Sequence, residues 1–318
     1  MTGGRRRTAL VRGSHVLADV APPDLDDVRA RATAAFLGLA LGDALGATLE
    51  FMTPAEIRAR HGVHRELRGG GWLRLRPGCV TDDTEMSLCV ARAIEAAGGW
   101  DARAVAERFA AWLRAGPTDV GSTVRRGIRR FMLEGTLAGP PGEGDAGNGA
   151  AMRMVPVALA TLGDGALMAR RAIAQARITH HHPLSDAACV HVGELVQLAC
   201  LGRSKRELRL ASDALVARAP AFAFEPYPGL ATAYVVDTLQ TVLHGFHSTG
   251  GFEACLVDVV NRGGDADTTG AIAGAIAGAH YGPGELPARW LRRLDRAVRE
   301  EIEDLAARLV ARSPLLSA

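Results

Sequence analysis

Apolar residues recur along this chain at intervals of three and four, the spacing that places them on one face of an α-helix. The pattern predicts helices over residues 28–50, 85–97, 102–113, 121–134, 152–162, 184–200, 205–217, 231–244, 252–261, 269–280 and 287–311. Strand-like alternation occurs only weakly, at residues 72–75, and no low-complexity linker divides the chain. We therefore expect an all-α fold, a single compact multi-helix domain over residues 28–318 that follows a disordered N-terminal extension at residues 1–27.

Two of the predicted helices carry glycines at intervals of four residues. One set is Gly38, Gly42 and Gly46, and the other is Gly270, Gly274 and Gly278. This spacing puts each set on one helix face, where a missing side chain lets another backbone approach closely. Since glycine inside a helix costs about 1 kcal/mol relative to alanine, we expect both helices to lie in the crowded centre of the domain. Incidental glycines in a glycine-rich chain are the alternative.

Composition and charge narrow the class of protein. Hydrophobic residues make up 48% of the chain and charged residues 23%, which is typical of a globular protein. A net charge of +2 does not favour a nucleic-acid partner. The five cysteines are widely spaced and form no CxxC motif, which indicates reduced thiols and a cytoplasmic protein. No apolar run reaches the ~20 residues that span a bilayer.

Two acidic side chains stand next to each other just before one predicted helix. The segment reads Thr81, Asp82, Asp83 and Thr84. A Thr or Asp at this position ordinarily caps the helix by accepting hydrogen bonds from its first N–H groups. One Asp is enough for a cap, and two adjacent carboxylates repel each other unless a cation or a proton lies between them. By itself, the segment fits a helix cap and a metal site equally well.

A second segment repeats this composition far along the chain. Asp265, Asp267 and Thr268 follow two glycines and precede the predicted helix at residues 269–280. Two such segments indicate one oxygen-rich site that is assembled from distant parts of the sequence. Oxygen ligands without cysteine or paired histidine favour Mg²⁺ or Mn²⁺ over Zn²⁺. Four Asp carboxylates and the Thr hydroxyl groups are enough for two divalent metal ions.

Other polar residues could complete the site. Glu50 ends the first predicted helix, where a negative charge is unfavourable for the helix dipole unless a cation is near; a solvated helix end is the alternative. A glycine-rich loop at residues 145–151 leads into a predicted helix, and such a start can hold a phosphate or sugar oxygen, although an ordinary turn fits as well. Three consecutive histidines at residues 180–182 cannot all face one ion from a regular helix.

These segments together resemble the ADP-ribosylglycohydrolase family. The matching motifs are Phe36-Leu-Gly-Leu-Ala-Leu-Gly-Asp-Ala-Leu-Gly-Ala47, Thr81-Asp-Asp-Thr84, Gly147-Asn-Gly149, Ile178-Thr-His180 and Gly263-Gly-Asp-Ala-Asp-Thr-Thr269. The resemblance extends from about residue 30 to the C-terminal end and implies an all-helical domain with two Mn²⁺ or Mg²⁺ ions that removes ADP-ribose from an arginine side chain. Within the family, Glu50-Phe-Met-Thr53 and Gly70-Gly-Trp-Leu-Arg-Leu75 resemble members that act on ADP-ribosylated dinitrogenase reductase, the nitrogenase iron protein.

The resemblance also implies roles for individual residues. The expected metal ligands are Thr81, Asp82, Asp83, Asp265, Asp267 and Thr268, with Glu50 close by. The expected ADP-ribose cleft is lined by Asp119, Ser122, Asp145, Gly147, Asn148, Gly149 and His180, with Ser122 standing where the family pattern has Asn. The expected catalytic residues are Asp119 and Glu50. Either could act as general base or guide the leaving group, and the sequence does not choose between them.

The resemblance further implies partners and leaves other functions open. It implies a monomer that is regulated by a PII-type signalling protein and held reversibly at the membrane by an ammonium transporter. Three alternatives remain at this point. The hydrolase could act on another acceptor protein or linkage, the Asp clusters could serve a metal-dependent phosphoesterase, or the chain could bind ADP-ribose without turnover.

Overall fold

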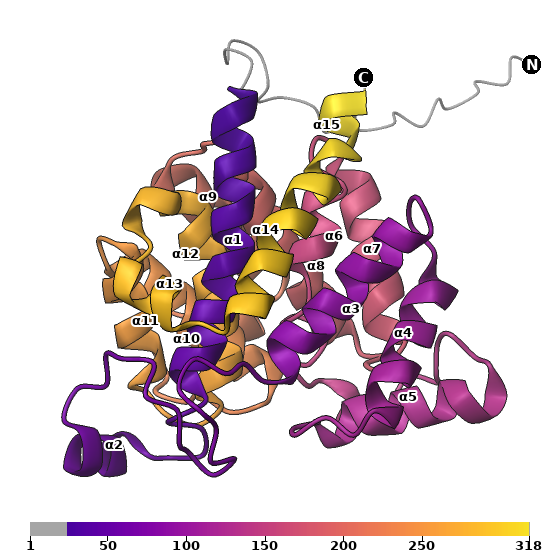
Figure 1. Cartoon of the computed structure of the whole chain (residues 1–318). Helices are drawn as coiled ribbons and strands as arrows, with labels where there is room; N and C mark the ends of the chain where they lie inside the picture. The colour runs from indigo at the N-terminus through magenta and orange to yellow at the C-terminus, as the bar shows by residue number, and fades with distance from the viewer. Residues whose placement is uncertain (1–23, 318) are drawn as a thin grey trace, which may run out of the picture.

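The computed structural model describes residues 24–317, so most of the predicted N-terminal extension lies outside the described residues (Figure 1). The helices are α1 (Leu25–Gly46), α2 (Pro54–His61), α3 (Asp82–Ala96), α4 (Ala102–Arg114), α5 (Ser122–Glu134), η1 (Glu143–Asp145), α6 (Val155–Leu159), α7 (Gly165–Arg177), α8 (Pro183–Cys200), α9 (Lys205–Arg218), η2 (Pro220–Phe222), α10 (Val235–Ser248), α11 (Phe252–Val260), α12 (Ala266–Tyr281), η3 (Pro283–Glu285), α13 (Ala288–Arg293), α14 (Arg296–Ala311) and α15 (Pro314–Ser317). Residues 24–317 contain no β-strand, and the all-α prediction is confirmed.

Helices α1 and α12 form the centre of the domain, as the glycine spacing predicts. They run antiparallel with their backbones in contact, because Gly38 lies against Gly274 and Gly42 lies against Gly270. Figure 1 shows α1 passing through the middle of the molecule, with α14 and α8 beside it and α12 behind. The antiparallel arrangement brings the end of α1 to the beginning of α12. The segment that follows α1 and the segment that precedes α12 therefore meet.

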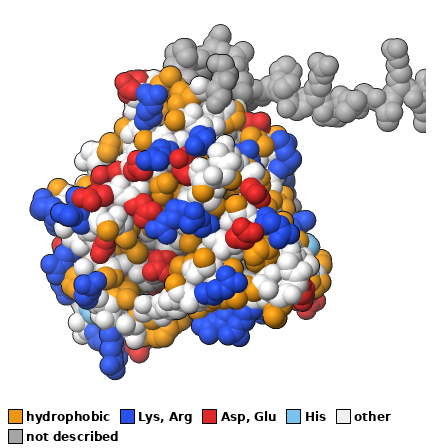
Figure 2. All heavy atoms as spheres, turned by 45° about the vertical axis from the view of Figure 1, so that its right-hand side comes forward, with side chains coloured by type: hydrophobic (Ala, Val, Ile, Leu, Met, Phe, Trp, Pro, Cys, Tyr) orange, Lys and Arg blue, Asp and Glu red, His pale blue; other side chains and the backbone are white. Residues whose placement is uncertain are grey.

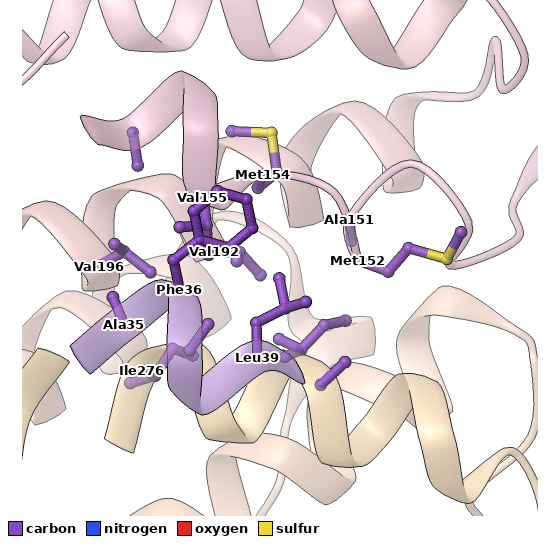
Figure 3. Packing of buried hydrophobic residues seen from close by; sticks show 14 of the residues in the cluster. Ala35, Phe36, Leu39, Ala151, Met152, Met154, Val155, Val192, Val196 and Ile276 are labelled. Carbon is purple, nitrogen blue, oxygen red and sulfur yellow. The ribbon is translucent and has the colours of Figure 1, made fainter. Parts of the chain in front are cut away.

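The hydrophobic core spreads from α1 to the surrounding helices. Phe36 and Leu39 are buried on α1, and the Phe36 ring points toward Val155 of α6 and Val192 of α8 (Figure 3). Ile276 of α12 belongs to the same core. Helices α3, α4 and α5 pack on one side of this centre, and α10 and α11 pack on the other (Figure 1). The packed centre of the domain thus supports the end of α1 and the beginning of α12.

Several helix boundaries differ from the predicted ones. Helix α1 begins at Leu25 because Asp24 caps it, and it ends at Gly46, so Glu50 lies in the following turn and not on the helix. The predicted helix at residues 287–311 is interrupted where Asp295 caps the start of α14. The weak strand at residues 72–75 is a turn closed by a bridge between Gly70 and Leu75.

Besides the short α15 and the 3-10 helices, α2 and α7 were not predicted. Helix α2 is polar and buries only Ile57, so it carries almost no apolar period; its signal was the capping box formed by Thr53 and Glu56. Helix α7 buries Met168 and small alanines, which give a weak pattern. In the other predicted segments, helices do form.

The surface carries charges of both signs. Figure 2 shows Lys or Arg and Asp or Glu side chains interspersed over one face, which agrees with the near-balanced net charge. Among the described residues, no helix combines the length and the apolar character needed to cross a membrane.

Candidate active site

A cleft of about 330 Å³ opens where the end of α1 meets the start of α12. The acidic segments at the starts of α3 and α12 form its floor, and the start of α5 and the loop at residues 147–149 form its walls. The lining residues are Glu50, Phe51, Trp72, Asp82, Asp119, Val120, Gly121, Ser122, Thr123, Val124, Gly147, Asn148, Gly149, Met152, His180, Ala233, Asp265, Asp267 and Thr268. Most of the predicted site residues thus come together in one cleft.

The first acidic segment is held by a residue that the sequence analysis did not assign, Asp43 of α1. Its carboxylate is fully buried and accepts hydrogen bonds from the backbone N–H of Thr81 (3.0 Å) and of Thr84 (3.1 Å) and from both their hydroxyl groups. Asp43 therefore caps α3 from another helix, and the local Thr81 side chain makes no cap hydrogen bond. Because Asp43 makes the cap, Asp82 and Asp83 are not needed for it; Asp82 lines the cleft and Asp83 lies beneath its floor. A lone acid in the apolar stretch of residues 34–47 was the available signal.

The second acidic segment is positioned by two glycines in the left-handed region. Gly263 has φ of 70° and Gly264 has φ of 66°. A side chain on either residue would overlap a backbone carbonyl, that of Met52 or Ala231. The segment is tied in place because Gly264 donates to the Met52 carbonyl (2.9 Å) and Asp265 donates to the Ala231 carbonyl (2.7 Å). The glycines thus allow three chain segments to pack closely and aim the Asp side chains inward.

The carboxylates converge closely enough to share a cation. Glu50, Asp265 and Asp267 each offer an oxygen, and these oxygens lie within 4.8 Å of one another. Asp82 and Asp83 approach from the start of α3, and the hydroxyl of Thr268 donates to Asp83 at 3.4 Å. Thr81 and Asp83 are buried beneath the floor and are not part of the cleft lining. This grouping joins the two predicted clusters and Glu50 in one site.

Burial and mutual repulsion raise the pKa of these acids. Burial is the main cause for Asp82, Asp83 and Asp267, whose pKa values lie well above the ordinary value, and the neighbouring carboxylates add to it. The pKa of Glu50 rises to about 7, first through burial and then through the charges of Asp119 and Asp265, while a hydrogen bond from Trp72 opposes the rise. The acids therefore hold protons more tightly than usual unless a cation compensates their charge.

The donor set fits a divalent cation. All the converging ligands are oxygens, which hard ions such as Mg²⁺, Mn²⁺ and Ca²⁺ prefer. The Oδ1 atom of Asp83 is buried and has no hydrogen-bond partner among the described residues. A buried charged oxygen without a partner is costly, and a cation would satisfy it. The acidic cluster can therefore hold metal.

The glycine-rich loop forms one wall of the cleft against His180. The backbone N–H of Asn148 donates to the Ala233 carbonyl (3.1 Å), and its side chain donates to Asp265 (2.8 Å). Gly147 and Gly149 lie directly on the His180 ring, where a Cβ atom would come within 3.0 Å of it. The loop thus connects the second acidic segment to the histidine.

His180 is held neutral by its surroundings. Burial lowers its pKa to about 3, and the positive charge of Arg153 adds to this effect. The hydroxyl of Thr179 lies 2.8 Å from His180 Nδ1 and accepts a hydrogen bond from the fully buried Arg153 at 2.7 Å. A neutral imidazole can present either a donor or an acceptor to a ligand, depending on its tautomer. Arg153 was missed in the sequence, where nothing marks it as buried.

The remaining predicted residues divide into two groups. Asp119 and Ser122 line the cleft, and burial raises the pKa of Asp119. Asp145 does not reach the cleft lining, because it forms an ion pair with Arg126 and accepts a hydrogen bond from the backbone of His181. Asp145 was predicted to bind substrate, but its side chain does not line the cleft.

Comparison with known proteins decides the family. The model of the ADP-ribosylglycohydrolase family matches residues 24–317. The chain belongs to this family. It is 55% identical over 284 residues to the ADP-ribosyl-[dinitrogen reductase] glycohydrolase of Rhodospirillum rubrum, an alignment that covers 89% of this chain and 97% of that protein.

Other relatives of this ADP-ribosylglycohydrolase agree. It is 30% identical over 299 residues to the ADP-ribosylarginine hydrolase Tri1 of Serratia proteamaculans strain 568, which covers 89% of this chain and 80% of that protein. A solved structure described as an ADP-ribosylglycohydrolase-related protein complex matches with a TM-score of 0.81 and 35% identity, over 90% of this chain and 99% of that one. The resemblance seen in the motifs is confirmed.

Proposed function

We propose that this ADP-ribosylglycohydrolase removes ADP-ribose from protein arginine in a metal-dependent reaction, with ADP-ribosylated dinitrogenase reductase as its substrate. The observation that carries the proposal is the acidic cleft in which Glu50, Asp265 and Asp267 converge. The arginine linkage and the target follow the names of the relatives, which include a dinitrogen reductase glycohydrolase and an arginine hydrolase. No feature of the cleft favours a phosphoesterase over this reaction.

Two divalent ions, Mn²⁺ or Mg²⁺, are the proposed cofactor. Their proposed ligands are Thr81, Asp82, Asp83, Asp265, Asp267 and Thr268, with Glu50 nearby. The raised pKa values of the buried acids and the unpartnered oxygen of Asp83 support this assignment. When bound there, such ions would supply positive charge that could orient ribose hydroxyl groups and a water molecule.

The reaction breaks the bond between the anomeric carbon of ribose and a guanidine nitrogen. The oxygen of water bonds to that carbon, one proton of the water must be accepted, and the departing guanidine must gain a proton. Glu50 and Asp119 line the cleft, and burial raises the pKa of both, that of Glu50 to about 7. A carboxylate with a raised pKa can perform such a transfer. Asn148 donates to the Asp265 carboxylate, and we infer that the negative charge of the Asp side chains stabilises the positive charge that develops at the anomeric carbon.

A hydrolysis assay tests the function directly. Arginine-ADP-ribosylated dinitrogenase reductase is incubated with the full chain, with and without Mn²⁺, and the released product is identified by mass. We expect metal-dependent release of intact ADP-ribose. Release of phosphate would identify a phosphoesterase, turnover of only serine-linked substrate would shift the linkage, and ADP-ribose binding without turnover would mean a binding module.

The pH profile separates the two candidate bases. We expect Glu50→Gln or Asp119→Asn to remove the acidic limb of the kcat/KM profile, and the variant that does so identifies the base. If both variants keep the limb, neither carboxylate accepts the proton.

The partners are proposed on the family resemblance. We propose a cytoplasmic monomer that binds a PII-type signalling protein and associates reversibly with the membrane through an ammonium transporter. Cell fractionation before and after addition of ammonium, together with size-exclusion chromatography, tests this. An unchanged distribution in the presence of both partners would contradict it.

A further inference from the structure

Two aromatic rings stand exposed at the edge of the acidic cleft. Phe51 is 66% exposed and Trp72 is 52% exposed, and both line the cleft next to Glu50. Their ring centroids lie 5.4 Å apart. Large apolar side chains in contact with one another and open to solvent are expected where a ligand covers them.

Phe51 is held in an unfavourable backbone conformation. Its φ is 63°, in the left-handed region that side chains other than glycine rarely adopt. The strain persists because its N–H donates to the Gly264 carbonyl (2.7 Å), beside the second acidic segment. Strain that the surroundings impose points to a function of the residue that bears it. Here it keeps the Phe51 ring at the cleft edge while the preceding Glu50 faces the acids.

Trp72 is placed by a separate turn. Gly70 and Leu75 exchange two backbone hydrogen bonds of 2.8 and 2.9 Å that close the turn, and Gly71 packs directly on the Ala47 carbonyl. The indole N–H of Trp72 donates to the Glu50 carboxylate. The ring and the carboxylate are thus fixed relative to each other before any ligand arrives.

The chemistry of this corner suits a guanidinium group. A planar cation binds to aromatic faces, and it also forms hydrogen bonds with carboxylates. The negative charges of Glu50 and Asp119 attract a cation there.

We propose that Phe51, Trp72 and Glu50 form the subsite for the guanidinium group of the acceptor arginine. This inference rests on the proposed function and adds to it the residues that recognise the leaving group. The aromatic pair selects a planar cation over a serine hydroxyl, because a neutral hydroxyl gains nothing from the ring faces.

Calorimetry with agmatine, an alkylguanidinium cation, tests the subsite on the full Mn²⁺-loaded chain. We expect Trp72→Leu and Phe51→Gly each to weaken agmatine binding by roughly fivefold to thirtyfold, the range of a desolvated cation–π contact. ADP-ribose affinity should stay within about twofold of wild type. Phe51→Gly relieves the backbone strain, so loss of folding does not explain its effect, and thermal unfolding of each variant checks this.

Two further variants sharpen the test. Trp72→Phe keeps a ring but removes the hydrogen bond to Glu50, so it should retain more agmatine affinity than Trp72→Leu. Trp100→Leu is the control, since Trp100 is a half-buried tryptophan that does not line the cleft and should leave both affinities unchanged. In turnover of arginine-linked substrate, the Trp72→Leu effect should fall on KM more than on kcat.

The outcomes separate the subsite from the proposed function. Unchanged agmatine binding in Trp72→Leu and Phe51→Gly would overturn the subsite even if wild type hydrolyses arginine-linked ADP-ribose. Weakened ADP-ribose binding with unchanged agmatine binding would overturn it as well and assign the rings to the ADP part. Failure of wild type to release ADP-ribose would refute the function alone, because agmatine binding is measured without turnover.

Discussion

The contact between α1 and α12 allows a single methyl group to test the architecture. In Gly42→Ala, the new Cβ would overlap the carbonyl of Gly270 and lie 2.9 Å from the nitrogen of Ala271. These atoms are helix backbone and cannot rotate away, so the two helices must separate by about 1 Å or more to reach ordinary contact distances. A gap of this size removes a quarter to a half of each dispersion contact along the interface.

The expected loss of stability follows from two opposing terms. Overpacking in a core costs about 1–3 kcal/mol and sometimes more, and a rigid backbone obstacle places this site at the upper end. Alanine recovers about 1 kcal/mol of helix propensity relative to glycine. We therefore expect Gly42→Ala to lower the free energy of unfolding by about 2 kcal/mol. Because Gly42 precedes Asp43, the shift should also weaken Mn²⁺ binding.

Urea denaturation followed by circular dichroism measures the effect. The control is Gly165→Ala, since Gly165 is exposed at the start of α7 and a Cβ there would meet nothing within 4 Å. We expect the midpoint of Gly42→Ala to fall with an unchanged m-value, and the control to match wild type within about 0.5 kcal/mol. A Gly42→Ala protein as stable as the control would refute direct backbone contact between α1 and α12.

Three further predictions concern the acidic site. Asp265→Ala should abolish Mn²⁺-dependent turnover while circular dichroism stays that of wild type; normal turnover would remove Asp265 from the site. Asp43→Ala should destabilise the protein by about 3 kcal/mol in urea, because the N–H groups of Thr81 and Thr84 lose their buried acceptor; an unchanged midpoint would mean that water replaces it. In EDTA, thermal stability should fall as pH rises from about 4 to 7. The pKa values of Asp43 (about 6) and Glu50 (about 7) in the folded protein exceed their ordinary values. The folded state therefore binds more protons than the unfolded state in this pH range. Saturating Mn²⁺ should flatten this slope, and an equal slope with metal would show that the acids do not bind it.

Sequence patterns predicted the features that depend mainly on residues close together in the chain, such as the helices and the adjacent carboxylates. Apolar periodicity marked most helices because a helix face must be buried whatever it packs against. It failed for α2, which buries Ile57 alone, although the capping box of Thr53 and Glu56 was a sufficient local signal. Adjacent carboxylates indicated a cation because their repulsion exists in any fold.

The sequence by itself determined the helical class, the close approach of two glycine-bearing helices and the residues of two acidic clusters. Only the tertiary structure decided that these clusters meet, because α1 packs antiparallel against α12 and Asp43, near the end of α1, holds the start of α3. It also gave Asp43 its role as a cap for α3, turned Asp145 toward Arg126 and away from the cleft, and brought Trp72 to Glu50. These contacts join residues that are distant in sequence, and no local pattern encodes the energy of such a contact.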